Sequence, residues 1–305
     1  MSFESLTQQP PAGLSEVQLD LAGVRMGRDT AIGWVDLTGL DEMPDVIASD
    51  VQRPTAHGVW AGDDYTGART ISWDVEIQEW DGTSFGAALA AYRRVMVPRP
   101  DPQDLVPLWS FLPDRGGPIR WDVRVRRHRV NTDLAYTLGV ARAAAQLSAP
   151  DPVGYGPGGV VSTAFAQQSG GLQFDLFTDG TVITGSLEFG PAGSTGRNRV
   201  DNAGTAPLWV AHRITGPTPD AGFEVVDITT GRRLRYVGVV PAGSVLDIDT
   251  GEGSVTLDGV ADRTGLLTVS EWTPVPAGGS TEFAFLPLSA ATSAVLETAF
   301  ASAWW

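Results

Sequence analysis

Apolar and polar residues alternate along much of the first third of the chain, and this period of two predicts β-strands. The clearest run is residues 71–78, in which four apolar residues share one face: Ile71, Trp73, Val75 and Ile77. Residues 17–21 alternate in the same way. We therefore expect a sheet with one buried face in this part of the chain.

A helical pattern follows this sheet segment. Its apolar residues recur three or four positions apart: Phe85, Leu89, Tyr92 and Met96. Thr83 or Ser84 can cap the N-terminus of the helix, and Pro98 and Pro100 prevent its continuation. Because the apolar stripe needs a partner surface, we expect the helix to pack on the sheet.

Two more alternating runs come after the helix. Residues 119–129 place Trp121, Val123 and Val125 on one face. The opposite face is basic and consists of Arg120, Asp122, Arg124 and Arg126. Residues 134–140 also alternate, and they are predicted to form a strand that pairs with the first run as a hairpin across residues 131–133.

The stretch 149–159 is rich in proline and glycine and can continue neither a sheet nor a helix. We expect a domain at residues 1–150, a linker at 151–159 and a second domain at 160–288. Short apolar runs separated by turns predict a two-sheet sandwich or jelly roll there. The predicted strands are 174–177, 182–183, 186–189, 209–214, 223–226, 245–248, 255–257 and 281–285, and the predicted turns are 178–180, 229–231, 249–253 and 277–279.

The last segment, residues 289–305, is predicted to contain a helix. Its apolar side would comprise Val295, Leu296, Ala299, Phe300, Ala303 and Trp304. An aromatic terminus favours docking on another surface, and the residues expected to dock are Phe300, Trp304 and Trp305. The predicted fold class is therefore mainly β, with an N-terminal sandwich or barrel-like domain that carries one packed helix, a C-terminal sandwich and a short C-terminal helix.

Composition excludes several kinds of chemistry. The 305 residues include no cysteine and no lysine, so disulfides, a thiolate nucleophile, a Schiff base and a phosphate-loop lysine are excluded. The net charge of -15 makes the chain a poor binder of nucleic-acid backbones, although an acidic surface can line a pore through which DNA passes. No apolar stretch is long enough to span a bilayer, so we expect no membrane insertion.

The short motifs do not point to a catalytic, cofactor or metal site. Asp249-Thr250-Gly251 matches the aspartic protease motif, but that chemistry needs a second carboxylate, and the flanking residues predict a hairpin loop. Acidic residues around it fit no EF-hand spacing. The glycine-rich runs 154–159 and 190–196 lack the spacing of phosphate loops. The three histidines are far apart in sequence and are interpreted as structural.

Charge is distributed unevenly, and this suggests an interface. Residues 119–142 carry six arginines against two acids (+4), between segments with net charges of -10 and -9. Arg120, Arg124 and Arg126 are candidates for pairing with carboxylates of an adjacent subunit, because a guanidinium binds a carboxylate bidentately; plain solvation is the alternative. Candidate sugar-stacking residues in the second domain are Trp209, Tyr236 and Trp272.

In the order of several short motifs, the chain resembles the distal tail proteins of siphovirus-type bacteriophages, which are also called minor tail proteins or siphovirus tail components. In the first domain these motifs are 40–41, 50–54, 57–58, 62, 67–77 and Pro98, followed by Asp151-Pro152 and Tyr155 in the linker. In the second domain they are 202–207, 214–217, 248–250, 255–259, Arg263, Trp272, 276–278 and the aromatic ending 300–305.

This resemblance implies a structural virion protein without catalysis or cofactors. Such proteins form hexameric rings at the distal end of the tail tube; the first domain makes the ring, and the second is galectin-like. The implied partners are further copies of the chain, the tail tube protein, the tail-tip or baseplate hub protein and the tape measure protein, with DNA passing through unbound. Assembly would take place in the host cytoplasm. The alternatives are a carbohydrate-binding module for cell-wall glycans and a cell-wall hydrolase, which needs two carboxylates at a defined separation.

Overall fold

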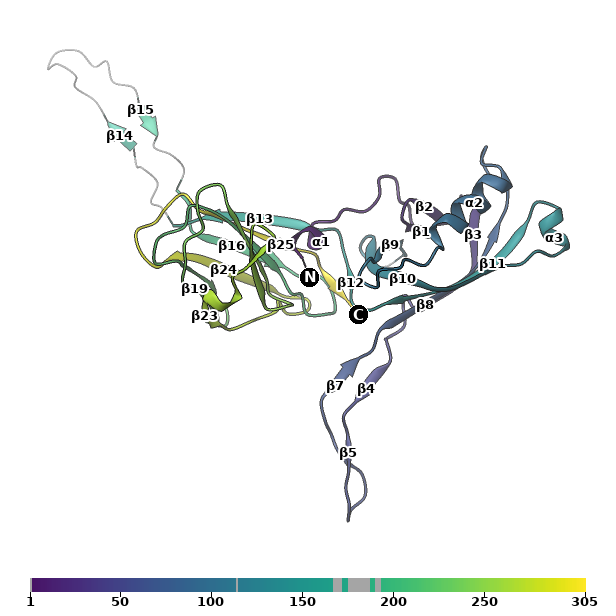
Figure 1. The fold of residues 1–305 in the computed structure, drawn as a ribbon, viewed down its shortest axis with the longest axis horizontal. Coiled ribbons are helices and arrows are strands. Elements are labelled where there is room, and N and C mark those ends of the chain that lie inside the picture. The colour runs from purple at the N-terminus through teal and green to yellow at the C-terminus, as the bar shows by residue number, and fades with distance from the viewer. Residues whose placement is uncertain (1, 114, 167–171, 175–186, 190–192) are drawn as a thin grey trace. The chain divides into compact units, whose positions relative to one another are not determined.

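The computed structural model describes residues 2–113, 115–166, 172–174, 187–189 and 193–305 (Figure 1). They form two compact units. The N-terminal unit consists of Gln9–Pro157 with Trp304–Trp305, and the C-terminal unit consists of Met1–Gln8 with Gly158–Ala303. The first residues of the chain therefore belong to the unit that its second half builds, and the last two belong to the unit that its first half builds.

A sheet of nine strands forms the N-terminal unit. Its strands are β1 (Gln18–Leu21), β2 (Val24–Gly27), β3 (Ile32–Thr38), β8 (Arg69–Ile77), β9 (Val106–Phe111), β10 (Ile119–Val130), β11 (Ala141–Ala149), β12 (Gly154–Tyr155) and β26 (Ala303–Trp304). The main path is β2-β1-β9-β10-β11-β8-β3, and every pair along it is antiparallel. β12 pairs with β10 and with β26.

The predicted strand and helix of the first third are confirmed. Burial alternates along β8, so that Trp73 and its apolar neighbours enter the core. Helix α2 (Phe85–Val95) packs against this core, and its N-cap Ser84 accepts a hydrogen bond of 3.3 Å from the amide of Ala87. Tyr92 of α2 is fully buried and accepts a hydrogen bond of 3.4 Å from the indole of Trp73.

The predicted strand at 134–140 is wrong. Asp133 caps a short helix, α3 (Leu134–Thr137), by accepting a hydrogen bond of 3.2 Å from Tyr136 N, and Gly139 follows with a φ of 84°. Leu134 and Leu138 are one helical turn apart, and they are 77% and 76% exposed rather than buried. The strand that pairs with β10 is β11, which begins after this turn.

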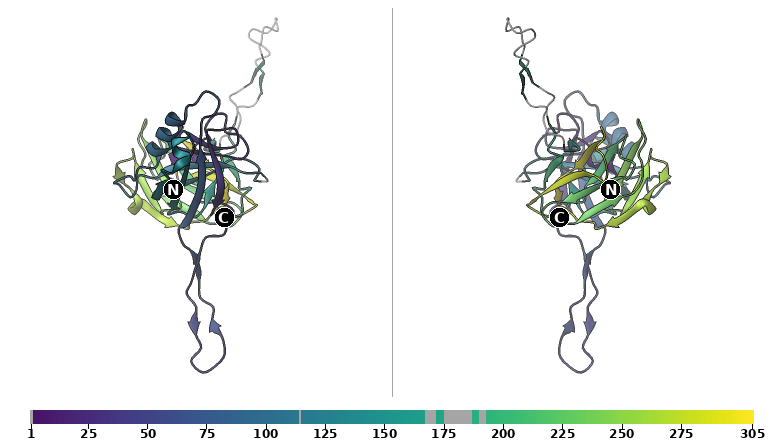
Figure 2. Two further views of the ribbon diagram at one scale, coloured as in Figure 1. Left: turned by 90° about the vertical axis from the view of Figure 1, so that its right-hand side faces the viewer. Right: turned by 90° about the vertical axis from the view of Figure 1, so that its left-hand side faces the viewer.

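A two-stranded arm, defined here as residues 41–68, leaves the sheet between β3 and β8 (Figures 1 and 2). It contains β4 (Val46–Ala48), β5 (Val51–Gln52), β6 (Val59–Trp60) and β7 (Asp64–Thr66). β4 pairs with β7 and β5 pairs with β6, while neither pair joins another sheet. Most arm side chains are exposed to solvent.

The C-terminal unit is a two-sheet sandwich, as predicted. One sheet has the order β13-β25-β17-β20-β21-β22 and the other β16-β24-β18-β19-β23. The first comprises β13 (Gly159–Ala164), β17 (Ala211–Thr215), β20 (Val245–Asp249), β21 (Ser254–Leu257), β22 (Ala261–Asp262) and β25 (Val295–Phe300). The second comprises β16 (Arg197–Asp201), β18 (Phe223–Asp227), β19 (Arg233–Tyr236), β23 (Leu267–Ser270) and β24 (Ser280–Pro287).

Side chains of the two sheets meet in a common core. The ring of His212 on β17 lies edge-on to Phe283 on β24, with 5.0 Å between ring centroids. Short elements complete the unit: α1 (Phe3–Leu6), a 3-10 helix η1 (Thr264–Leu266), and the pair β14 (Leu172–Phe174) and β15 (Leu187–Phe189). The predicted strand 182–183 and turn 178–180 lie outside the described residues, as do most of 174–177 and part of the loop 190–196.

The predicted C-terminal helix is wrong, because residues 295–300 form β25, which pairs with both β13 and β17. Over residues 295–298 the burial has a period of two, since Leu296 and Thr298 are fully buried while Glu297 is not; Ala299, which follows, is also buried. Backbone pairing on both edges outweighed a sequence pattern that also fits a helix. In the part of the chain that the structure describes, no helix has the length and apolar character needed to cross a membrane.

Candidate subunit interface

A β-bulge in β10 determines which arginines share one face of the N-terminal sheet. Val125 lies opposite Leu147 of β11 and Arg127 lies opposite Gln146, so Arg126 is one residue more than the partner strand has. Strict alternation from Val125 would turn Arg127 towards the core. Because of the bulge, Arg127 and Arg129 instead share the outer face with Gln146 and Ala144.

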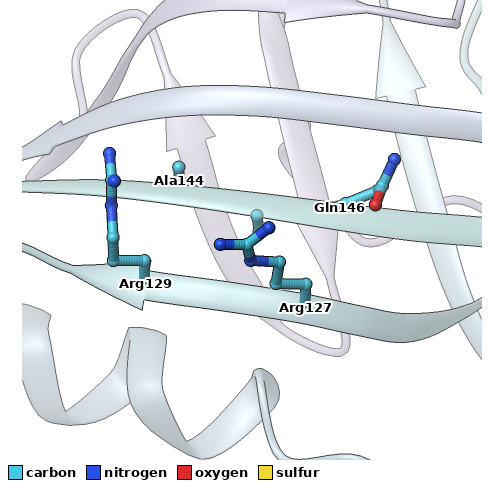
Figure 3. Close-up of a pocket in the computed structure, with 5 residues that line it drawn as sticks. Arg127, Arg129, Ala144 and Gln146 are labelled. Atoms are coloured by element: carbon cyan, nitrogen blue, oxygen red, sulfur yellow. The ribbon is translucent and has the colours of Figure 1, made fainter.

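These side chains line a groove of about 280 Å³, called the basic groove below: Arg127, Arg129, Ala144, Ala145 and Gln146. Figure 3 shows Arg127 and Arg129 on β10, with Ala144 and Gln146 on the neighbouring strand. The small side chain of Ala144 leaves the space open. Neither Arg127 nor Arg129 forms an ion pair with a residue that the structure describes. The groove therefore presents two guanidinium groups to solvent.

The charge of the outer face changes from positive on β10 to negative on β8. An adjoining groove of about 380 Å³ is lined by Arg129 and by Asp74 and Glu76 of β8. Arg142 of β11 lies between the two sides, and its Nε is 3.5 Å from a carboxylate oxygen of Glu76. Among the described residues of this face, Arg142 has an ion pair whereas Arg127 and Arg129 of β10 have none.

The three predicted interface arginines do not share one surface. Arg120 is buried, lies 3.3 Å from a carboxylate oxygen of Asp122 and stands 5.9 Å from the ring centroid of Trp109. Burial lowers the pKa of the Arg120 guanidinium. Arg124 is half-buried, and Arg126 is exposed at the bulge. Arg120 is thus corrected to an internal residue, and Arg127 and Arg129, which the sequence analysis missed, take its place on the surface.

The terminal aromatic residues fall into different units. Phe300 is half-buried in β25, next to Gly159, where an added Cβ would come within 2.6 Å of the Phe300 ring. Trp304 is partly buried and packs against the core of the N-terminal unit. Trp305 is exposed. Trp304 is therefore docked on the N-terminal unit, and docking of Phe300 and Trp305 on a neighbouring protein stays a prediction.

The structure removes one of the three predicted sugar contacts. Tyr236 is buried and stacks on Phe223, with 5.3 Å between ring centroids, so a sugar cannot reach its face. Trp209 is exposed, and Trp272 is half-buried. Their role in glycan binding stays a prediction.

The acidic residue of the Asp249-Thr250-Gly251 motif stabilises a turn. Asp249 accepts hydrogen bonds of 3.0 Å from the amides of Gly251 and Glu252, which confirms the hairpin loop between β20 and β21. Among the described residues, no group of three or more His, Asp or Glu side chains is arranged to hold a metal ion.

The arm is the other feature that the sequence analysis did not identify. Six of its large apolar side chains are between 47% and 69% exposed: Met43, Val46, Ile47, Val51, Trp60 and Tyr65. Its sequence carries six acids and one arginine, and its apolar residues have no sustained period of two. The arm could have been recognised in the sequence by the unusual number of isolated apolar residues within an acidic segment.

An exposed apolar arm together with a strand that carries exposed arginines is typical of a protein that assembles with others. Residues 203–304 match the family model for the C-terminal domain of siphovirus-type tail components. The predicted resemblance to siphovirus tail components is thereby confirmed for this part of the chain. No curated protein sequence matches the chain.

The fold is similar to the crystal structure of the SPP1 Dit protein (gp 19.1), described as a paradigm of the hub adsorption apparatus in phages that infect Gram-positive bacteria. The TM-score is 0.59 and the sequence identity is 12%, and the similarity covers 93% of this chain and 98% of that chain. A chain of the phage P2 baseplate in its activated conformation with calcium gives a TM-score of 0.45 at 11% identity, over 89% of this chain and 91% of that chain.

Proposed function

We propose that this protein is a structural component of a siphovirus tail, in which six copies form a ring at the distal end of the tail tube. The ring would connect the tube to the tail-tip or baseplate proteins, leave a channel for DNA and perform no catalysis. The observation that carries this proposal is the match of residues 203–304 to the siphovirus-type tail component family. The fold similarity to the SPP1 hub protein supports it over most of the chain.

The outer face of β10 supplies a surface for self-association. Arg124 and Arg126 carry no ion pair within the described residues, and a guanidinium fork is well suited to carboxylates of an adjacent subunit. A contact between two different surfaces of the same protein repeats around an axis and closes a ring when the rotation permits. The net charge of -15 fits a channel that repels the phosphates of passing DNA.

The test is the mass and shape of the purified full-length protein. Mass photometry should detect a species of six chains of 32.3 kDa each, and electron microscopy of the same sample should show rings with a central opening. A single-chain species at every concentration tested would overturn the proposal.

A paired substitution addresses the interface. Arg124→Glu with Arg126→Glu should reduce the assembled fraction, because these charges would then repel carboxylates of the neighbour. Arg93→Glu with Arg94→Glu on the exposed side of α2 is the matched control, since it changes the net charge equally at a distant position. Equal assembly of the two variants would exclude this role for Arg124 and Arg126.

A further inference from the structure

A cavity in the N-terminal unit has the size of a small-molecule site. It measures about 370 Å³ and lies where α2 meets the turns on either side of β2 and the turn that leads from β8 to α2. Sites for small molecules usually measure roughly 300–1,000 Å³. Figure 1 shows α2 beside β2 and β3. Ala88 and Ala91 of α2 keep the space open, because their side chains end at Cβ.

One wall of this cavity is aromatic. Trp80 follows β8 and is 43% exposed, so part of its indole is open to a ligand. Two backbone hydrogen bonds hold Trp80 against Thr83: the amide of Trp80 donates to the carbonyl of Thr83 at 3.1 Å, and the amide of Thr83 donates back at 2.8 Å. An indole on a backbone fixed in this way is a platform for the apolar face of a ligand ring.

Four charged side chains line the same cavity, and their charges cancel. Asp29 and Asp81 are negative, and Arg25 and Arg94 are positive. The basic groove, in contrast, is lined by two arginines and no acid. A balanced set of charges attracts neither anions nor cations strongly. It suits a neutral ligand whose hydroxyl groups donate to the carboxylates and accept from the guanidinium groups.

The polar groups of the cavity are fixed or free to bind. Both terminal nitrogens of Arg25 donate to backbone carbonyls, those of Ala12 and Gly13, which hold the guanidinium in place. Within the described part of the chain, the carboxylates of Asp29 and Asp81 form no hydrogen bond or ion pair. Both aspartates have a positive φ, 57° and 43°, which is uncommon outside glycine. Strained backbone at two positions around one cavity is typical of a binding site.

We propose that this cavity binds a neutral saccharide ring, stacked on Trp80 with its hydroxyl groups on Asp29, Asp81 and Arg94. A saccharide ring joins an apolar C–H face to hydroxyl groups at its edge and carries no charge, as this lining requires. The site belongs to the N-terminal unit, whereas the sugar contacts predicted from the sequence belong to the C-terminal unit. The inference goes beyond the structural role in the tail and does not depend on ring formation.

Saturation-transfer NMR of the full chain tests the site, with glucose, galactose and N-acetylglucosamine as separate probes. At least one should bind with a dissociation constant on the order of 1 mM, as expected for a single small ring. Trp80→Ala should weaken this binding about tenfold, and Trp80→Phe should recover part of it, since phenylalanine keeps an aromatic face. Trp60→Ala, which removes an exposed indole from the arm, is the matched control and should bind like the unsubstituted protein.

The carboxylates have their own variant, Asp29→Asn with Asp81→Asn. Asparagine tolerates a positive φ as aspartate does, so the unfolding temperature should not change, while the cavity becomes positive. Sugar binding should fall several-fold, and inorganic phosphate should bind more tightly than it does to the unsubstituted protein. Unchanged sugar binding in this variant would exclude the two carboxylates as contacts and contradict the proposal.

The remaining outcomes separate the ligand classes and the two units. Equal binding by Trp80→Ala and the unsubstituted protein, or no binding of any of the three sugars, would overturn the proposal. Loss of binding in Trp209→Ala but not in Trp80→Ala would assign the sugar to the C-terminal unit instead. Tetramethylammonium binding that depends on Trp80, without sugar binding, would make the cavity a cation site. None of these results changes the mass photometry that tests the ring.

Discussion

The guanidinium of Arg69 donates a hydrogen bond of 2.7 Å from Nη1 to the backbone carbonyl oxygen of Glu42, at the root of the arm. The same nitrogen donates to the carbonyl of Gly39 at 2.7 Å, and Nε donates to that of Pro152 at 2.9 Å. The side chain is buried, and burial lowers the pKa of this guanidinium. One buried cation thus ties the root of the arm to the backbone of the N-terminal unit.

Replacing Arg69 should loosen the root of the arm. Arg69→Ala leaves four backbone carbonyl oxygens without this donor, those named above and that of Leu40, and it removes packing against Trp121. We therefore expect a loss of about 3 kcal/mol in the free energy of unfolding. Arg69→Lys should recover only part of it, because an ammonium cannot form the same fork. Urea unfolding measures the loss, and chymotrypsin cleavage at Trp60 and Tyr65 should become faster.

The exposed Arg93→Ala on α2 is the control for this prediction and should leave both measurements unchanged. If Arg69→Ala matches the unsubstituted protein in arm cleavage, then the arm root is held by other contacts, such as those of Arg115 with Leu40 and Asp41.

A buried histidine makes the C-terminal unit sensitive to acid. His212 is enclosed between the sheets, where Nδ1 lies 2.9 Å from Thr298 Oγ1, and burial lowers the pKa of His212 to about 4. The unfolded chain binds this proton with a pKa near 6.5, so it takes up the proton at higher pH than the folded chain. The contribution of neutral His212 to the free energy of unfolding is therefore fully present above about pH 6.5 and is lost as pH falls towards 4.

We therefore expect the free energy of unfolding to fall by about 1 kcal/mol between pH 7.5 and 5.5 through this group alone. Calorimetric melting of the full chain across this range measures the effect. His212→Gln keeps a polar group beside Thr298 but does not titrate, and it should flatten the dependence. A variant that melts with the same pH dependence as the unsubstituted protein would assign the effect to other groups.

Arg213 connects α1 to the C-terminal sandwich through two unequal ion pairs. Nε and Nη2 donate to the two carboxylate oxygens of Asp247 at 2.6 and 3.0 Å, and Nη2 also donates to Glu4 at 2.5 Å. The hydrogen bond from Arg213 lowers the pKa of Glu4, whose side chain is largely exposed. Bidentate, half-buried pairs are stronger than solvated ones.

In double-mutant cycles that replace each charged residue by glutamine, the coupling energy should be about 1 kcal/mol for Arg213 with Asp247. For Arg213 with Glu4 it should be about a few tenths of a kcal/mol. Glu297 lies opposite Arg213 on the other neighbouring strand, and its coupling should be the smallest of the three. Urea unfolding at low salt provides the free energies. A stronger coupling with Glu4 than with Asp247 would show that α1, rather than the sheet, dominates this site.

The hydrophobic pattern determined the elements whose burial is regular. β8 and α2 were predicted because one face of each packs on a single core, so that periods of two and of three to four residues are visible in the sequence. The sandwich of the C-terminal unit followed from short apolar runs between turns. Composition determined the absence of thiol and lysine chemistry, since that depends only on which residues the chain contains.

Tertiary structure decided the features that depend on partner strands. Residues 295–300 fit a helix in isolation and became a strand because two neighbouring strands pair with them. The bulge at Arg126 is set by register with β11, and it alone places Arg127 and Arg129 on the outer face. The arm has no periodic pattern because it buries no face within the chain. Sequence carries local periodicity, whereas register and exposed surfaces arise only when distant segments meet.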